Sequence, residues 1–187
     1  MGDEGNLNYR HPTQVKLRIA LFWLPNYFGG NYVGMLNTSE AILKEHNLGL
    51  SIWPSSAPHG KTKLDFSGDV VELADYEEIR QAIQSVLTAE NRLNHLPIVF
   101  GQLRNSAYGI TVTDTSSRCW KRPMCMLSPN YDGDYATLVH EAGHAGGLHH
   151  DRTSTGSFKR NFMCDGAQRS TMMKFQVQKL AKAFFVT

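Results

Sequence analysis

Four histidines stand close together in a segment that reads His-Glu-Ala-Gly-His-Ala-Gly-Gly-Leu-His-His from residue 140 to residue 150. Residues four apart share one face of a helix, so the imidazoles of His140 and His144 can reach the same metal ion. Gly147 can adopt a positive φ angle, which ends a helix sharply and lets the chain turn back with His150 as a third ligand. The segment therefore predicts a helix that ends in a tight turn beside a metal site.

Three neutral imidazoles with a fourth position left open are typical of a catalytic zinc site rather than a structural one. Glu141 follows His140 directly, about 100° further round the helix, so its carboxylate is expected beside the metal and not on it. That is the position of a general base acting on water. The alternative, a surface helix with solvated histidines, explains neither the spacing nor Gly147. His149 is one residue short of the pattern and is predicted to lie near the site or in solvent without being a ligand.

The segment resembles the extended motif of the metzincin clan of zinc peptidases, which is matched at every defined position by His140, Glu141, His144, Gly147 and His150. The clan also implies a methionine in a tight turn beneath the metal. Met163, in the stretch Asn-Phe-Met-Cys-Asp-Gly from residue 161 to residue 166, matches this Met-turn. Met172 and Met173 are the competing candidates, but their helical context predicts that they are core residues.

The resemblance implies an α+β fold with an α/β-type upper part: a twisted, mostly parallel sheet, an active-site helix, the Met-turn and a C-terminal helix. Residues 1–187 are expected to form one catalytic domain, with residues 1–14 flexible or added at the expression start. The resemblance does not assign a family within the clan, although Asp151 after the third histidine is similar to reprolysin-like and small bacterial members.

The implied function is that of a zinc-dependent endopeptidase that holds one zinc ion and cleaves protein or peptide substrates, with Glu141 as general base. The requirement for calcium is left open. One alternative is an inactive relative that keeps the metal for stability and binds a protein partner. Another is a peptidase toxin or effector domain excised from a larger secreted protein.

The composition is that of a globular protein, with 41% hydrophobic and 19% charged residues. A net charge of +2 is too small to favour nucleic acid as a partner. No run approaches the roughly 20 apolar residues of a membrane span, and the short apolar run after Arg18 predicts a first strand and not a signal peptide. We expect a monomer that acts outside the producing cell.

Hydrophobic periodicity and turn residues predict nine helices and strands along the chain, including the helix that carries the histidine motif. Strands are expected at residues 15–24, 50–53, 96–100, 108–113 and 124–127. Helices are expected at residues 32–46, 76–93 and 134–146, with Asp132 or Asp134 capping the last of these, and from residue 170 to the C-terminus. Within residues 32–46 the apolar positions at helical intervals are Val33, Leu36, Ile42 and Leu43. The strand at residues 108–113 is the candidate edge along which an extended substrate would bind.

Three cysteines, Cys119, Cys125 and Cys164, allow at most one internal disulfide. A bridge between Cys119 and Cys125, a bridge from either to Cys164, and three free thiols are all compatible with the sequence. Nucleophilic cysteine chemistry has little support, because the three motif histidines are committed to the metal and leave no base for a thiol.

Overall fold

The structure is a computed structural model that describes residues 9–27, 30–55, 62–104, 108–113, 122–128, 136–150, 161–164 and 170–187. Within these ranges the strands are β1 (Val15–Trp23), β2 (Leu48–Trp53), β3 (Leu96–Phe100), β4 (Gly109–Val112) and β5 (Met124–Leu127). The helices are α2 (Tyr32–Glu45), α3 (Tyr76–Ala89), α4 (Thr137–Ala145) and α5 (Lys174–Leu180), with a 3₁₀ turn at Leu73–Asp75 before α3.

The five strands form one sheet in the order β2-β1-β3-β5-β4. All neighbouring pairs are parallel except β4 with β5, which is antiparallel. The predicted α+β class with a mostly parallel sheet is therefore confirmed. Strand β4, within the candidate edge at residues 108–113, is the last strand on its side of the sheet.

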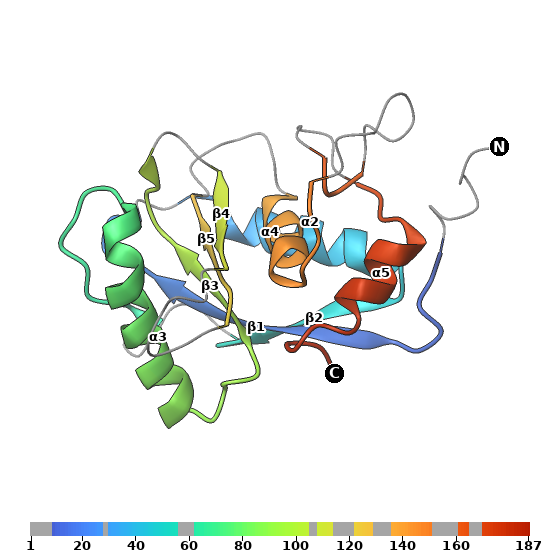
Figure 1. Cartoon of the computed structure of the whole chain (residues 1–187), viewed down its shortest axis with the longest axis horizontal. Coiled ribbons are helices and arrows are strands. Elements are labelled where there is room, and N and C mark those ends of the chain that lie inside the picture. Colours follow the sequence, from blue (N-terminus) through green and yellow to red (C-terminus); the bar gives the residue numbers. More distant parts are fainter. Residues whose placement is uncertain are drawn as a thin grey trace.

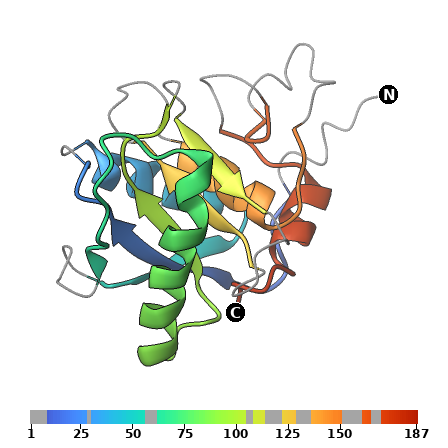
Figure 2. The ribbon, with the colours of Figure 1, turned by 60° about the vertical axis from the view of Figure 1, so that its left-hand side comes forward.

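Helices cover both faces of the sheet, as the alternation of side chains along β1 requires. Leu17, Ile19 and Leu21 point into a core shared with α2, α4 and α5, whereas Ala20 and Phe22 point into a second core shared with α3. Figure 1 shows α2 and α4 together behind and beside the strands, and Figure 2 shows α3 alone in front of the opposite face. The histidine motif on α4 thus belongs to the face that α2 and α5 share.

The strands predicted at residues 96–100 and 124–127 are found with the same limits, and the helical period predicted from residue 76 onward is found in the buried residues of α3. Helix α3 buries Ile79, Ile83 and Leu87 on one stripe, which is the 3.6-residue period of the sequence. Val33, in contrast, does not join the core: its side chain is 50% exposed, and Met35 is buried in α2 instead.

Several helix limits differ from the prediction: α3 ends at Ala89 and not at residue 93, and α5 begins at Lys174 and not near residue 170. Helix α4 begins at Thr137, with Ala136 as its N-cap residue and no side-chain cap, while Asp132 and Asp134 lie outside the described residues. Helix α5 ends at Leu180 and does not continue to the C-terminus. The reason is that residues after α5 turn back and bond to β1.

The last residues of the chain extend the sheet at the start of β1. Val186 forms an antiparallel bridge with Leu17, and backbone hydrogen bonds join Lys16 to Thr187 in both directions. Strand β3 pairs with β1 only from Ile19 onward, so the returning residues occupy the part of β1 that β3 does not reach. No helix in the described part of the chain is long and apolar enough to cross a membrane.

Candidate metal centre

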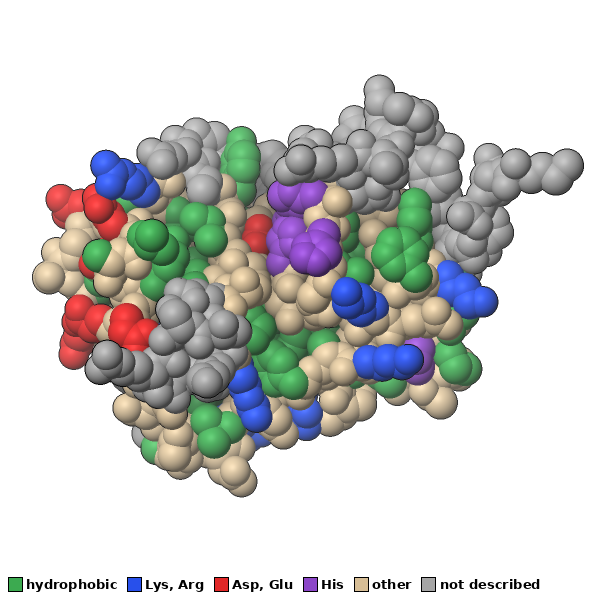
Figure 3. Space-filling model, viewed as in Figure 1, with side chains coloured by type: hydrophobic (Ala, Val, Ile, Leu, Met, Phe, Trp, Pro, Cys, Tyr) green, Lys and Arg blue, Asp and Glu red, His purple; other side chains and the backbone are tan. Residues whose placement is uncertain are grey.

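The side chains of His140, His144 and His150 converge at the molecular surface. The Nε2 atom of His140 lies 3.1 Å from Nε2 of His150 and 3.2 Å from Nε2 of His144. All ligand nitrogens of the group lie within 4.8 Å of one another, with His140 buried, His144 half-buried and His150 exposed. Figure 3 shows histidine side chains gathered in one patch on this face. The three predicted ligands are therefore together, and they could hold a metal ion.

Backbone carbonyl groups determine which nitrogen faces the centre of the cluster. Nδ1 of His140 lies 2.6 Å from the carbonyl oxygen of Phe162, and Nδ1 of His144 lies 2.8 Å from that of Leu148. A carbonyl oxygen only accepts, so each Nδ1 carries the proton and donates it. In the neutral rings both Nε2 lone pairs are then directed toward the centre. Lone pairs so close repel one another, and a cation between them removes that repulsion.

The separation of the nitrogens matches a small, tetrahedrally bound cation. For metal–nitrogen bonds of about 2.0–2.1 Å, two ligands of a tetrahedral ion are about 3.3–3.4 Å apart. The separations of His140 Nε2 from the other two Nε2 atoms, 3.1 Å and 3.2 Å, are within a few tenths of an ångström of that value. The two ligands on α4, His140 and His144, therefore fit such an ion without rearrangement of the helix, and the His150 nitrogen lies within 4.8 Å of both.

Helix α4 ends as the motif predicts, and this brings His150 back to the cluster. Gly147 has a φ of +83°, a conformation that glycine adopts without steric cost. The ammonium group of Lys179 on α5 donates to the Gly147 carbonyl oxygen at 2.5 Å. A cation at the C-terminal end of a helix is also favoured by the helix dipole. Lys179 was not among the predicted site residues, because its position depends on how α5 packs against α4.

Glu141 lies on α4 beside the histidines and faces β4. Its side chain is 5% exposed, and Oε2 lies 2.5 Å from the hydroxyl oxygen of Thr111. The same hydroxyl oxygen lies 2.9 Å from the Glu141 carbonyl oxygen. Glu141 is not part of the group of three metal-binding residues among those described. The sequence motif contains no signal for Thr111, which lies 30 residues earlier in the chain.

Met163 packs against α4 at Gly143. It is fully buried, and a Cβ atom placed on Gly143 would lie 2.5 Å from its sulfur and 2.8 Å from Cε2 of Phe162. Gly143 stands between His140 and His144 in the helix, so the turn at residues 161–164 packs directly beneath the metal-binding turn of α4. Met172 is also fully buried, but its backbone N–H is hydrogen-bonded to His46, at a distance of 3.2 Å.

A pair of buried amides fixes this turn to α5. The side chains of Asn161 and Gln176 donate to each other, both at 3.0 Å. Asn161 Oδ1 also accepts the backbone N–H of Met163 at 2.8 Å, and Gln176 Oε1 accepts that of Met173 at the same distance. The two amides therefore satisfy backbone donors of the turn and of the start of α5 at once.

Two of the three cysteines, Cys125 and Cys164, are described, and both are buried. Cys125 lies behind Thr111, with its sulfur 3.6 Å from the Thr111 hydroxyl oxygen. Burial, and then the negative charge of Glu141, raise the pKa of the Cys125 thiol far above its usual range. The thiol therefore stays protonated and is not a nucleophile at neutral pH. Cys119 lies outside the described residues, as do Asp151 and the part of the Met-turn after Cys164.

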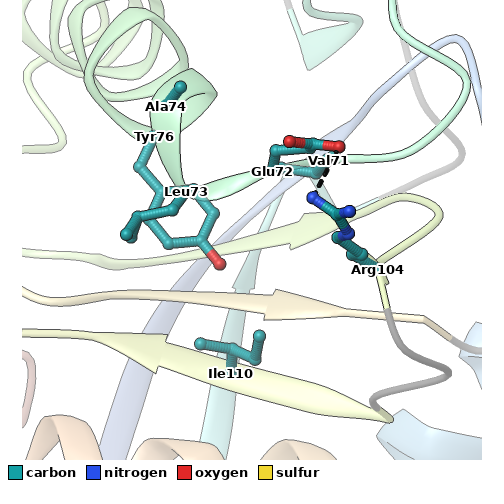
Figure 4. A pocket seen from close by; sticks show the side chains of 7 residues that line it. All are labelled: Val71, Glu72, Leu73, Ala74, Tyr76, Arg104 and Ile110. Atoms are coloured by element: carbon teal, nitrogen blue, oxygen red, sulfur yellow. Dashed lines mark ion pairs between the residues drawn. The ribbon is translucent and has the colours of Figure 1, made fainter.

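A separate cavity of about 570 Å³ lies on the α3 face of the sheet and contains none of the three histidines. Figure 4 shows the Glu72 carboxylate paired with Arg104 at its rim, while the ring of Tyr76 extends toward Ile110 of β4. Ile110 packs with the α3 core, whereas Gly109 and Thr111 on either side of it contact α4. Strand β4 thus stands between this cavity and the metal centre.

Comparison with known proteins gives a likeness of fold. No protein-family model matches the sequence, and no curated protein matches it. A solved structure described as "Structure of a chaperone-substrate complex" contains a chain that superimposes on 90% of this one with a TM-score of 0.57 at 12% sequence identity. The chain spans 38% of the length of that neighbour. At this identity the similarity concerns the fold alone, and it agrees with the α+β architecture described above.

Proposed function

We propose that this protein is a zinc-dependent endopeptidase of the metzincin type. His140, His144 and His150 would hold the zinc ion, and Glu141 would be the general base. The observation that carries the proposal is the convergence of three imidazole nitrogens beside a buried carboxylate that is not one of them. A metal site that only stabilises a fold does not require such a carboxylate. The position of Met163 beneath α4 also supports the resemblance to metzincins.

Zinc suits this set of ligands because it binds imidazole well and accepts tetrahedral geometry with one open position. When bound, zinc would polarise a carbonyl group and make a water molecule more acidic. The Glu141 carboxylate would take a proton from the attacking water and transfer it to the leaving amine. The carbonyl groups of Phe162 and Leu148 would keep the His140 and His144 rings in the orientation that binding needs.

The outer edge of β4 is the proposed binding site for the substrate backbone. An extended peptide can add to an exposed sheet edge through main-chain hydrogen bonds. Strand β4 is the last strand on its side of the sheet, and Thr111 within it contacts Glu141. A peptide bound along β4 would therefore pass close to the carboxylate and the three histidines.

The test is the replacement of Glu141 by Gln in the zinc-loaded protein. Because Glu141 is not a ligand, Glu141→Gln should keep the metal and the fold, while hydrolysis of a mixed peptide library should fall by at least about 10²–10⁴-fold. Glu45→Gln is a control, since Glu45 is an exposed residue at the end of α2. A metal-loaded wild-type protein that cleaves no peptide, yet binds a protein partner equally well with Glu or Gln at position 141, would instead establish the binding-module alternative.

A further inference from the structure

Strand β4 supplies a hydrogen bond to the side chain of Glu141. The Thr111 hydroxyl group has one hydrogen atom and two oxygens within reach: Oε2 of Glu141 at 2.5 Å and the Glu141 carbonyl oxygen at 2.9 Å. An ionised carboxylate is the stronger acceptor, and the shorter contact has the length of a charge-assisted hydrogen bond. Thr111 therefore donates to the carboxylate while it stays in contact with the backbone of the same residue.

We propose that Thr111 is the positioning residue of Glu141. This inference rests on the proposed function, because it gives Thr111 a task in catalysis only if Glu141 is the general base. The Glu141 side chain rotates about three single bonds before its carboxylate, so a free carboxylate would lose much of its freedom on reaching a reactive position. A hydrogen bond that already holds Oε2 removes that freedom before substrate binds.

The surroundings of the contact restrict the carboxylate further. A Cβ atom on Gly109 would lie 2.9 Å from Cγ and 3.0 Å from Oε1 of Glu141, so the strand backbone itself lies against this side chain. Gly109 and Thr111 are two residues apart and share one face of β4. On the other side of Thr111 is the buried Cys125 thiol. The carboxylate thus lies in a narrow space shaped by β4, where low solvent access strengthens the hydrogen bond.

The location of Thr111 on an edge strand has a consequence for substrate binding. The strand that would pair with an extended peptide is the same strand that holds the carboxylate. A peptide paired along β4 would therefore have its backbone at a defined distance from the Glu141 carboxylate. The inferred role of Thr111 is to fix the position of the Glu141 carboxylate relative to the bound peptide. Loss of the Thr111 hydroxyl group should therefore lower kcat and leave the affinity for substrate unchanged.

The first test compares three variants in the zinc-loaded protein. Thr111→Val keeps the shape of the side chain and removes the hydroxyl group, and Thr111→Ser keeps the hydroxyl group. Thr88→Val makes the same change at an exposed residue of α3, on the other face of the sheet. We expect Thr111→Val to lower kcat at least tenfold with little change in KM or bound zinc. Thr111→Ser should retain most of the wild-type kcat, and Thr88→Val all of it. Equal losses in Thr111→Val and Thr111→Ser, or no loss in either, would overturn the inference.

The second test does not depend on activity. The midpoint temperature of unfolding is measured on metal-free protein for Thr111→Val in the wild-type and Glu141→Ala backgrounds, with Thr88→Val treated in the same way. The decrease in midpoint temperature caused by Thr111→Val should be clearly smaller when the Glu141 side chain is absent, whereas the change caused by Thr88→Val should be the same in both backgrounds. Equal losses for Thr111→Val overturn the inference even if the protein is a peptidase. If the variants show the coupling between Thr111 and Glu141 but the zinc-loaded wild-type protein hydrolyses no peptide, the proposed function is overturned, and with it the catalytic role of Thr111.

Discussion

Nδ1 of His140 lies 2.6 Å from the carbonyl oxygen of Phe162, so a predicted metal ligand on α4 is hydrogen-bonded directly to the turn that contains Met163. The same turn packs its Met163 sulfur against Gly143, one helical turn further along α4. The orientation of the ring and the support beneath it therefore come from adjacent residues of one short segment. Changes in this segment should affect metal binding as well as stability.

Metal retention should depend on the three converging histidines and not on their neighbour. His140→Ala, His144→Ala and His150→Ala each remove one of three ligands, so the zinc content of the purified protein should fall well below the one ion per chain expected for the wild type. His149→Ala is the matched control, because His149 is exposed and not part of the cluster. Elemental analysis measures the result. Full zinc in the His150 variant together with loss in the His149 variant would contradict the ligand assignment.

The packing under α4 should make Gly143→Ala destabilising, although alanine is normally favoured over glycine inside a helix by about 1 kcal/mol. The added Cβ would lie 2.5 Å from the Met163 sulfur and 2.8 Å from Cε2 of Phe162, so these two buried side chains must shift. We expect a loss of roughly 1–3 kcal/mol in the free energy of unfolding. Met163→Leu, a nearly volume-conserving change, should cost less than about 1.5 kcal/mol. Denaturant unfolding of both variants checks this order, and a stabilised Gly143→Ala protein would contradict it.

The buried amide pair should be strongly coupled. Asn161→Ala removes one partner of Gln176 and also leaves the Met163 N–H without its acceptor. Buried polar groups without partners cost about 1–3 kcal/mol each, so this variant should lose at least about 2 kcal/mol. The double variant Asn161→Ala/Gln176→Ala should lose less than the sum of the two single changes. Strict additivity in urea unfolding would show that the pair does not act as a unit.

Protonation of His95, which lies just before β3, should contribute to the loss of folding stability at acid pH. Its side chain is 4% exposed, and burial, followed by the charges of Arg92 and Arg18, lowers the pKa of His95 to about 4. Between that value and the ordinary pKa near 6.5, the unfolded chain binds the proton and the folded protein does not. The free energy of unfolding should therefore fall as the pH drops through this range, by an amount on the order of 1–3 kcal/mol.

The measurement for His95 is the pH dependence of urea unfolding in metal-free protein, where zinc release does not contribute. His95→Asn lacks the titrating ring, so its free energy of unfolding should decline less between pH 6.5 and pH 4 than that of the wild type. Parallel curves for the two proteins would show that His95 does not contribute to acid sensitivity.

The features that the sequence predicts well are those determined by neighbouring residues. The ligand spacing of His140 and His144 depends only on helical geometry, and the turn at Gly147 depends on a local φ angle, which the structure confirms at +83°. The same holds for the buried stripe of α3, since its amphipathic period is contained in one helix. These predictions require no knowledge of how distant segments pack.

The features that the sequence does not reveal are those that join distant segments. Thr111 contacts Glu141 across 30 residues of chain, and Asn161 contacts Gln176 across 15, so neither pair has a local signature. The end of α5 at Leu180 also depends on distant segments. The residues after Leu180 are apolar enough to continue a helix, but tertiary hydrogen bonds to β1 compete successfully with local propensity.

The return of the chain to β1 also sets an order for assembly. Residues 185–187 bond to the beginning of the first strand, and α5 just before them supplies Gln176, which holds the turn that orients His140. The segments that fix the orientation of His140 therefore follow the histidine cluster in the sequence, in the turn at residues 161–164 and in α5. The cluster should reach its final rigidity only when residues 185–187 have paired with β1 and α5 holds that turn in place.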